Sequence, residues 1–393
     1  MLASALSLLL SLTVTVTNPL DSPREAVPVI IPISNVKGEI NSATIKGYPE
    51  LPYQLDDLDD DGRPDELVFL LDLKPNAKET ISINLSDKPE TRKFTAGTNA
   101  YIRLNDKNKK HPKINAIAFP GNADNRQMYN SIYGHGVVLE GLFNAIRIYM
   151  DNRQSVDLYA KNTPQLELDV TGFYTTPEQL KQGYGRDILW AGTSVALGSF
   201  RGYEDGTPLT IDSVTTRMQR VVTTGPIRSI VEVNDRGWVS APGKAPVDMR
   251  QRYTMYAGHR DVEVDILIRG AKAGDTYCTG IQKLATDNVG FINADGLAGS
   301  WGKNIPDKNL PDIDETLGLG IYVAAPYLQS VVEDDLNYLT LLKADANGHI
   351  RYTFTSAALR DTTSPRTSEE WFSYLAKWET DLMHPVKTTV KKK

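Results

Sequence analysis

The segment MRQRYTMYAGHRDVEVDILI (Met249–Ile268) decides the fold, because it contains two alternating strand-like runs around one turn. Glycine favours tight turns, so we place the turn at Gly258-His259, where we expect the His259 ring to be solvated. Because successive side chains point to opposite faces of a strand, one face is predicted to be apolar and the other charged. Counting outward pairs Met255 with Val262 and Tyr253 with Val264 toward a core, and Thr254 with Glu263 and Arg252 with Asp265 on the other face. Arg252 and Asp265 are predicted to form an ion pair.

Strand-like runs recur along the whole chain, with Gly, Pro, Asn or Asp between them. They include LTVTVTNPL (12–20), AVPVIIPI (26–33), ELVFLLDL (66–73) and AIRIYM (145–150). Many short strands at this spacing, with few helical segments, are typical of antiparallel sandwiches. The sequence therefore predicts an all-β protein, an antiparallel sandwich with a few short helices.

Two segments carry helix signals. Pro177 after Thr176 predicts a short helix that ends at Gly183. Thr367 and Glu370 make a capping-box pattern before EEWFSYLAKWETDLM (369–383), a second helix. Four large apolar residues of that helix share one face and are predicted to pack on the core: Trp371, Leu375, Trp378 and Leu382. The final KTTVKKK (387–393) is predicted to be frayed.

Composition excludes several classes of protein. Of the 393 residues, 40% are hydrophobic and 23% are charged, which is ordinary for a globular protein. The net charge of −6 argues against a nucleic acid partner or an anionic membrane bound by general attraction. The single cysteine, Cys278, excludes an internal disulfide and a cysteine-rich zinc site, and we expect it to be buried in a strand.

The first twelve residues, MLASALSLLLSL, resemble the apolar part of a secretory signal and are too short to span a membrane. We therefore expect residues 1–12 to be a signal peptide or its remnant, and the protein to be periplasmic or secreted. Residues 13–95 are predicted to form an N-terminal β-strand region and residues 96–393 a larger β-sandwich region. The alternative is one continuous domain.

His135 is the main candidate for proton transfer. It lies between Gly134 and Gly136, which leave space for a ligand, and beside Tyr129 and Tyr133. If Tyr133 and His135 belong to one strand, their side chains point to the same side. The alternative is a structural histidine whose ring is satisfied by a neighbour.

Other candidates come from separate segments. Trp190 offers a face on which a sugar ring could stack, and Arg201 could bind a carboxylate through two parallel hydrogen bonds. Lys283 could supply a second positive charge, and Asn130 and Trp301 complete the predicted substrate contacts. The alternatives are a buried tryptophan in a surface loop and an exposed strand lysine.

DLDDDGRPDEL (57–67) resembles the first half of a calcium-binding loop. Asp57, Asp59, Asp61 and Asp65 supply oxygen ligands at alternate positions, and Gly62 allows the sharp turn. The usual glutamate at the twelfth position is missing, since Val68 lies there. The loop is a candidate site for a structural calcium, a solvated acidic turn is the alternative, and no cofactor is required.

The order of several motifs resembles one family of secreted bacterial proteins. These motifs are DLDDDGRPDEL, YGHGVVLE (133–140), DNRQSVDLYAK (151–161), ILWAG (188–192), GSFRG (198–202) and RYTMYAGHRDVEV (252–264). The family long carried an unknown-function label and is encoded in polysaccharide-utilisation loci. The resemblance implies a β-supersandwich similar to galactose mutarotase and an activity like that of ulvan-oligosaccharide dehydratases.

Such an enzyme removes water across C4–C5 of a terminal uronic acid and leaves a 4,5-unsaturated residue. With an acidic oligosaccharide as substrate, His135 would act as base or acid with Tyr133 or Tyr129 as its counterpart, and Arg201 or Lys283 would stabilise the developing charge. Two other readings stay open. A glycoside hydrolase needs a pair of carboxylates, which the many acidic residues do not single out. A non-catalytic glycan-binding protein would use Trp190 and Trp301 alone.

Overall fold

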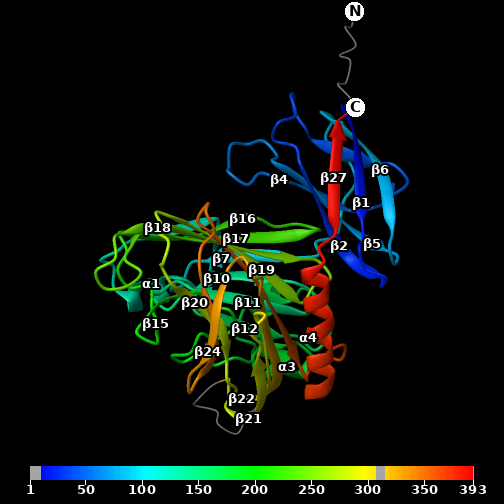
Figure 1. Cartoon of the computed structure of the whole chain (residues 1–393). Coiled ribbons are helices and arrows are strands. Elements are labelled where there is room, and N and C mark those ends of the chain that lie inside the picture. Colours follow the sequence, from blue (N-terminus) through cyan, green and yellow to red (C-terminus); the bar gives the residue numbers. More distant parts are fainter. Residues whose placement is uncertain (1–9, 307–314, 393) are drawn as a thin grey trace, which may run out of the picture.

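The computed structural model describes residues 10–306 and 315–392, and within them the protein is an antiparallel all-β sandwich. Figure 1 shows a smaller upper part, which contains both the earliest strands and the last one, above a larger body. The predicted fold class is confirmed. The similarity to galactose mutarotase stays a prediction.

The upper part contains two small sheets. The four-stranded sheet has the order β27 (Lys387–Lys392), β1 (Leu10–Thr17), β6 (Lys78–Ser86) and β3 (Ser42–Ile45). The three-stranded sheet has the order β2 (Arg24–Pro32), β5 (Glu66–Leu73) and β4 (Tyr53–Asp56). Their inward residues, such as Val14, Val29, Phe69 and Ile83, form a hydrophobic cluster of their own.

The larger body contains three sheets. The six-stranded sheet has the order β13 (Arg186–Asp187), β12 (Val156–Ala160), β11 (Asn144–Tyr149), β10 (Gly136–Glu140), β7 (Asn99–Arg103) and β8 (Lys113–Ile114). The nine-stranded sheet has the order β21 (Thr286–Ile292), β22 (Leu297–Asn304), β23 (Glu315–Val323), β26 (His349–Ala358), β19 (Asp261–Arg269), β18 (Val247–Tyr256), β17 (Arg228–Trp238), β16 (Thr216–Thr223) and β9 (Ala116–Pro120). The five-stranded sheet has the order β15 (Thr207–Leu209), β14 (Arg201–Glu204), β20 (Tyr277–Gln282), β25 (Asn337–Leu342) and β24 (Leu328–Glu333).

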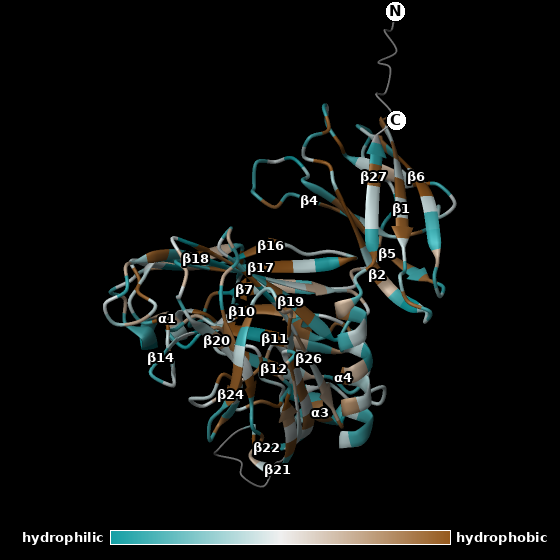
Figure 2. Ribbon diagram, in the orientation of Figure 1, coloured by the Kyte–Doolittle hydropathy of each residue, from teal (hydrophilic) through white to brown (hydrophobic). Residues whose placement is uncertain are grey.

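One hydrophobic core joins these three sheets. It includes Ile146 and Ile148 of the six-stranded sheet, Val231 and Val264 of the nine-stranded sheet, and Ile281 of the five-stranded sheet. Figure 2 shows hydrophobic residues concentrated in the strands and hydrophilic residues over the loops. Each sheet therefore has one apolar face in the core and an outer face that is available for charged groups.

The central hairpin forms as predicted. β18 pairs with β19 so that Met255 lies opposite Val262 and Tyr253 opposite Val264, and these four side chains are buried in the core. Arg252 lies opposite Asp265, but the predicted ion pair between them is wrong. Arg252 binds Glu232 on β17 (2.6 Å), while Asp265 binds His349 (2.7 Å) and Arg351 (2.9 Å) on β26. Each inner strand of the nine-stranded sheet has two neighbouring strands, so a charged side chain on it can pair with a residue of either one.

Among the described residues the helices are α1 (Asn125–Ser131), α2 (Leu168–Thr171), α3 (Pro177–Lys181) and α4 (Ser368–Met383). Both predicted helices form, and Thr176 and Thr367 cap them by accepting hydrogen bonds from Gln179 N and Glu370 N. Trp371, Leu375 and Trp378 of α4 are buried against β22 and β23. No helix in the described ranges is long and apolar enough to cross a membrane.

Two predictions concern segments near the ends of the chain. The predicted frayed tail is wrong, because β27 pairs with β1 from Leu12–Lys392 to Thr17–Lys387 (Figure 1). The predicted signal segment lies outside the described residues up to position 9, whereas Leu10–Leu12 begin β1 and Leu12 is buried. The predicted domain boundary at residues 95/96 stays a prediction.

His259 links the upper part to the body, which makes the prediction of a solvated ring wrong. Its Nδ1 lies 3.0 Å from Asp261 Oδ1, and its Nε2 lies 2.8 Å from the carbonyl oxygen of Ala26 in β2. Trp378 of α4 donates to the other oxygen of Asp261 (2.8 Å). Since both partners of the ring can only accept, both ring nitrogens carry protons and the ring is cationic. Burial alone would lower the pKa of His259, but the Asp261 carboxylate raises it to about 9.

We predict that this contact makes stability depend on pH in the alkaline range. A raised folded-state pKa adds stability that is complete below the unfolded value of about 6.5 and is lost as the pH rises through about 9. His259→Gln should therefore lower the free energy of unfolding by about 1–3 kcal/mol at pH 6.5 and by much less at pH 9.5. Thermal unfolding at both pH values measures this, with His384→Gln at the end of α4 as the control. A variant that loses the same stability at both pH values would contradict the assignment.

Candidate functional site

A pocket of about 380 Å³ lies on the outer face of the six-stranded sheet. Its lining comes from α1, three neighbouring strands and the segments on either side of α3. The residues that line it include Tyr129, Arg147, Tyr149, Arg153, Asp157, Phe173, Tyr174, Arg186, Asp187, Leu189 and Trp190.

Strand alternation places the polar centre of this pocket. Ile146 and Ile148 of β11 point into the core, so Arg147 and Tyr149 point to the outer face. Asp157 on β12 lies directly opposite Arg147, and Asp187 on β13 lies opposite Tyr159, two residues along β12. Three adjacent strands thus bring one arginine and two carboxylates together.

Arg147 is the central cation of the pocket. Its Nη2 contacts Asp157 Oδ2 and lies 3.0 Å from Asp187 Oδ2, and its Nη1 lies 3.3 Å from Tyr174 Oη. The guanidinium also lies 4.2 Å from the centre of the Phe173 ring. Burial alone would lower the pKa of Arg147, but Tyr149, Asp157 and Asp187 raise it well above its usual value. The cation is therefore permanent.

The two carboxylates differ in their surroundings. Asp157 is buried and fully bonded, since it accepts from Arg147, from Tyr149 Oη (2.8 Å) and from Leu158 N (2.9 Å). Asp187 keeps 24% of its side chain exposed. Burial, and then the negative charge of Asp157, raise the pKa of Asp187 well above its usual value. A raised pKa suits Asp187 to carry a proton and to deliver it to a group in the pocket.

Aromatic side chains form the walls. Trp190 is 42% exposed and Tyr174 is 45% exposed, although both are large apolar groups. Burial raises the pKa of Tyr174 to about 12, so its hydroxyl keeps its proton. Exposed aromatic faces beside polar groups are suited to a ring-shaped ligand with hydroxyls. Of the predicted residues, Trp190 and Tyr129 line this pocket.

His135 lies just behind the pocket wall. It occupies the turn before β10, not a strand, with a positive φ of 68°. The predicted shared side with Tyr133 is therefore wrong: the His135 ring stacks on Tyr129 (centroids 3.7 Å apart) and the Tyr133 ring stacks on His111 (3.9 Å). The His135 ring centre lies 6.0 Å from that of Tyr174. Asn130 is exposed on α1, and its carbonyl oxygen accepts from Asn105.

The hydrogen bond of His135 fixes its tautomer. Its Nδ1 lies 2.9 Å from the carbonyl oxygen of Tyr129, which can only accept, so Nδ1 carries the proton. The Nε2 atom is then left with a lone pair. Burial lowers the pKa of His135, which keeps the ring neutral and able to accept a proton.

Three predicted residues lie elsewhere. Arg201 is only 3% exposed and donates to Phe200 O and Ser155 Oγ inside the protein, so it cannot bind a carboxylate from solvent. Lys283 binds Glu333 (3.0 Å) and the carbonyl oxygen of Asp334 (2.7 Å), and it is not part of the pocket lining. Trp301 is 8% exposed and packs beneath α4, which leaves no face for a sugar.

Sequence reasoning missed Arg147, Asp157 and Asp187. A signal for the first two was present, because AIRIYM and SVDLYA each place one charged residue inside an apolar strand. Such a residue is costly to bury unless it is paired. Which of the many opposite charges pairs with it depends on strand order, which the sequence does not state.

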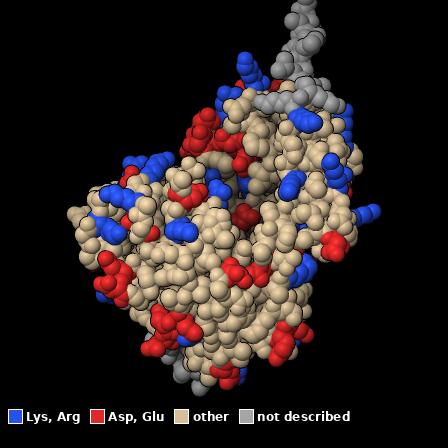
Figure 3. Space-filling model, in the orientation of Figure 1, with Lys and Arg blue, Asp and Glu red and all other residues tan. Residues whose placement is uncertain are grey.

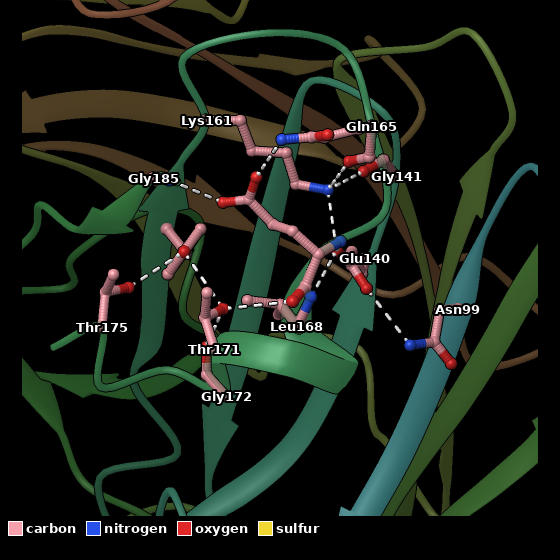
Figure 4. A network of polar contacts seen from close by, with 12 residues as sticks. Asn99, Glu140, Gly141, Lys161, Gln165, Leu168, Thr171, Gly172, Thr175 and Gly185 are labelled. Atoms are coloured by element: carbon pink, nitrogen blue, oxygen red, sulfur yellow. Dashed lines mark hydrogen bonds and ion pairs between the residues drawn. The ribbon is translucent and has the colours of Figure 1, made fainter. Parts of the chain in front are cut away.

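A buried polar network holds the segment that closes the pocket. Lys161 has a fully buried side chain and donates to Glu140 Oε1 (2.8 Å), Gly141 O (2.5 Å) and Gln165 O. The same Glu140 oxygen accepts from Glu167 N (2.5 Å) and Leu168 N (3.0 Å) at the start of α2. Figure 4 shows how these bonds converge on Glu140 and Lys161. Phe173 and Tyr174 follow α2 directly, so the network positions two walls of the pocket.

Tyr159 secures the same segment from β12. Its hydroxyl lies 3.2 Å from Thr171 Oγ1 and 3.0 Å from Thr175 Oγ1, on either side of Phe173 and Tyr174. Glu167 adds a bond from Gly185 N (2.7 Å), two residues before Asp187. The pocket walls are therefore fixed to the sheet before any ligand binds.

Residues 16–388 match the family model described as a domain of unknown function, DUF4861. The chain belongs to the DUF4861 family. This agrees with the resemblance to a family that long carried an unknown-function label, while the dehydratase activity stays a prediction. No curated protein matches the DUF4861 chain.

Two solved structures from Enterococcus faecalis are similar to the DUF4861 chain. One is a protein in the glycosyl hydrolase family 38, with TM-score 0.49, 9% identity, and coverage of 97% of this chain and 47% of that chain. The other is an alpha-mannosidase, with TM-score 0.47, 9% identity, and coverage of 97% and 46%. The DUF4861 chain thus spans about half the length of each. At TM-scores below 0.5, these likenesses carry no argument about activity.

The predicted calcium loop brings three of its four aspartates together. Oxygens of Asp57, Asp59 and Asp61 lie within 4.8 Å of one another. Asp57 already accepts from Asp60 N and Gly62 N (both 2.7 Å), so the loop is closed by its own backbone. Asp65 is not part of this group and accepts from Leu58 N (2.8 Å). Calcium binding by the DUF4861 chain stays a prediction.

We predict that removing Lys161 alone is strongly destabilising. Lys161→Met leaves the Glu140 carboxylate buried without its cation, which should cost about 3–5 kcal/mol. Glu140→Leu combined with Lys161→Met should recover part of this loss, because no buried charge is left unpaired. Chemical denaturation measures the free energy of unfolding, with Lys181→Met on the exposed side of α3 as the control. Equal stability of the single and double variants would contradict this role of the pair.

We predict that calcium stabilises the protein through Asp57, Asp59 and Asp61. At a calcium concentration of about 100 times the dissociation constant, the gain is about 2.7 kcal/mol, and a chelator removes it. Thermal unfolding with and without calcium measures this. Asp59→Asn should abolish the shift, whereas Asp87→Asn, outside the loop, should keep it. No shift in the unaltered protein would contradict a bound ion.

Proposed function

We propose that the protein is an enzyme that removes water across C4–C5 of a terminal uronic acid in an oligosaccharide. The observation that carries the proposal is a pair of groups with opposite proton-transfer properties, one in the pocket lining and one just behind its wall. Asp187 is a carboxyl with a raised pKa, and His135 is a neutral imidazole whose Nε2 bears a lone pair. Elimination needs both an acid and a base.

The substrate ring and its carboxylate have suitable partners. Trp190 and Tyr174 would pack on the faces of the sugar ring, as exposed aromatic groups often do. Arg153 lies at the rim, 5.1 Å from the centre of the Tyr149 ring. Its Nε and Nη2 both bind Asp151 Oδ2 (2.8 and 2.6 Å), so Nη1 is directed elsewhere and would bind the uronate carboxylate.

The chemical step balances with these residues alone. His135 Nε2 takes the proton from C5, and the electron pair of that C–H bond becomes the new C4–C5 double bond. The C4–O bond breaks, and the departing hydroxyl takes the proton of Asp187 and leaves as water. Negative charge that develops on the substrate carboxylate is stabilised by Arg153. Proton exchange with solvent restores both side chains.

The alternative of a glycoside hydrolase has one observation in its favour, because Asp157 and Asp187 both contact Arg147 Nη2. A hydrolase needs both carboxylates to reach the sugar. Asp157 is 1% exposed and saturated by three donors, so it would serve to hold Arg147 and Tyr149 instead. The elimination reaction uses only the exposed carboxyl.

We predict that Asp187→Asn and His135→Asn each lower kcat at least about 10²-fold, since each removes one proton-transfer group. Asparagine keeps the size of Asp187 and tolerates the positive φ of His135. Turnover is followed by the absorbance of the conjugated double bond on uronate-ended oligosaccharides, together with loss of one water by mass. Asp205→Asn, in an exposed turn with positive φ, is the matched control.

The same assay separates the competing functions. A double bond formed with chain cleavage would indicate a lyase, and sugar release without a double bond a hydrolase. Binding without any product would indicate a glycan-binding protein. Full activity of both variants, with unchanged melting temperatures, would contradict the roles assigned to Asp187 and His135.

A further inference from the structure

A second and larger recess, of about 800 Å³, lies on the outer face of the nine-stranded sheet. Its floor is formed by β16, β17, β18 and β19, and its roof by the upper part at Pro32, Ser34, Leu58, Asp59 and Asp65. Figure 3 shows charged residues of both signs around the recess between the upper part and the body. We call it the arginine groove after the residues of its floor.

Two of the five arginines on the floor have full partners. Glu232 of β17 accepts from Arg220 on β16 (2.7 Å) and from Arg252 on β18 (2.6 Å). Glu232 is itself buried, and burial would raise its pKa, but Arg220 and Arg252 lower it. This trio fixes one end of the floor, where two arginines share one carboxylate, so their charges are only partly neutralised.

The other three arginines are not compensated in this way. Arg236, Arg250 and Arg269 come from β17, β18 and β19 in turn, and all three line the groove. Within the described ranges, no ion pair is found for Arg236 or Arg269, and the nearest carboxylate to Arg250 is Glu232 at 3.8 Å. Asp248 lies between them on β18, opposite Arg269, and accepts from Gly237 N.

Arg250 is the most informative of the three. Its Nε is buried and has no hydrogen-bond partner, and a buried donor without an acceptor costs about 1–3 kcal/mol. Burial, and then the charge of Arg252, lower the pKa of Arg250. A cation that lies next to another cation and keeps 32% of its side chain exposed in a groove is suited to bind an anion.

We propose that the arginine groove binds an acidic saccharide chain through Arg236, Arg250 and Arg269. The anionic groups would be carboxylates or sulfate esters, which share the planar or trigonal oxygen arrangement that arginine binds through two hydrogen bonds. Arg236 and Arg269 lie two strands apart, roughly 10 Å at the usual strand spacing. One anionic group cannot span this distance, so the ligand carries at least two.

The roof argues for a saccharide over a nucleic acid. Asp65, which lies outside the proposed calcium group, lines the groove from the roof, where a continuous phosphate backbone would meet repulsion. A saccharide chain has widely spaced charges and many hydroxyls, and a hydroxyl can donate to this roof carboxylate while the charged groups lie on the floor. A groove of opposite charges on its two sides therefore suits a chain that is both acidic and rich in hydroxyls.

This binding site does not depend on the chemistry proposed for the Trp190 pocket. It would hold a longer chain at a second place on the molecule, and binding is measured without turnover. The Asp187→Asn variant, which lacks the proposed acid, should bind such a chain as well as the unaltered protein does. Failure of the dehydratase proposal therefore leaves this one standing, and the reverse also holds.

The test is calorimetric titration of the full chain with defined oligosaccharides of about six residues. Three probes are compared: an unsulfated uronate oligosaccharide, a sulfated neutral one and an uncharged one of equal length. Arg250→Gln and Arg269→Gln should each weaken binding of the acidic probes at least tenfold. Arg126→Gln, on the exposed side of α1, should change it less than twofold. The uncharged probe should bind weakly to all variants.

Stability gives a second readout. Because the only ion pair of Arg250 among the described residues is the distant one with Glu232 (3.8 Å), Arg250→Gln should leave the melting temperature unchanged or raise it, which separates a ligand-binding role from a structural one. Acidic probes that bind the Arg250→Gln, Arg269→Gln double variant as tightly as the unaltered protein would overturn the proposal. A single-stranded oligonucleotide that binds more tightly than either acidic saccharide would overturn it as well.

Discussion

The alternation of side chains along a strand is the constraint on which both candidate sites depend. Within the sandwich, each strand of the six-stranded and nine-stranded sheets must place every second residue in one shared core, and the other residues must then face outward. Ile146 and Ile148 are fixed in the core, so Arg147 is fixed on the outer face of β11. In the same way Val231 and Val233 are buried, and Glu232 lies on the outer face of β17. The positions of the charged groups follow from the positions of the apolar ones.

Ion pairs between neighbouring strands then determine which charged groups on the outer faces remain available to bind a ligand. Asp157 compensates Arg147 and leaves Asp187 as the partly exposed member of the group, with a raised pKa. Glu232 binds Arg220 and Arg252 closely and leaves Arg250 with only a distant partner. Each site therefore contains a charged group that is held by close ion pairs within the protein, beside a charged group that has hydrogen-bonding capacity left for a ligand. A buried charge must be paired for the fold to be stable. A charge at the edge of a recess is partly hydrated, so it can stay unpaired until a ligand binds.

The sequence predicted what local pattern controls and missed what strand order controls. Alternation and Gly258 were sufficient for the register of β18 and β19, and the capping box was sufficient for α4. Arg252 was given the partner opposite it, because the sequence does not show that β17 lies on its other side with Glu232. The tail was expected to be frayed because its many lysines look solvated, yet the alternation Thr388, Val390 suits an edge strand beside β1. Arg201 was predicted to be accessible because the sequence does not show how deeply a side chain is buried.

For the same reason, the net charge of the chain predicts little about which ligands it binds at a particular recess. A net charge of −6 argues against an anionic partner bound by general attraction, since it describes the field far from the surface. Close to the surface, individual neighbours matter more than the sum. Several carboxylates are engaged by particular cations, as Glu66 is by Arg228 (2.5 Å), and so contribute little repulsion beyond their own partner. An acidic protein can therefore present Arg153 at one recess and Arg250 at another, and under the two proposals each would bind an acidic sugar by short-range hydrogen bonding with no contribution from the overall charge.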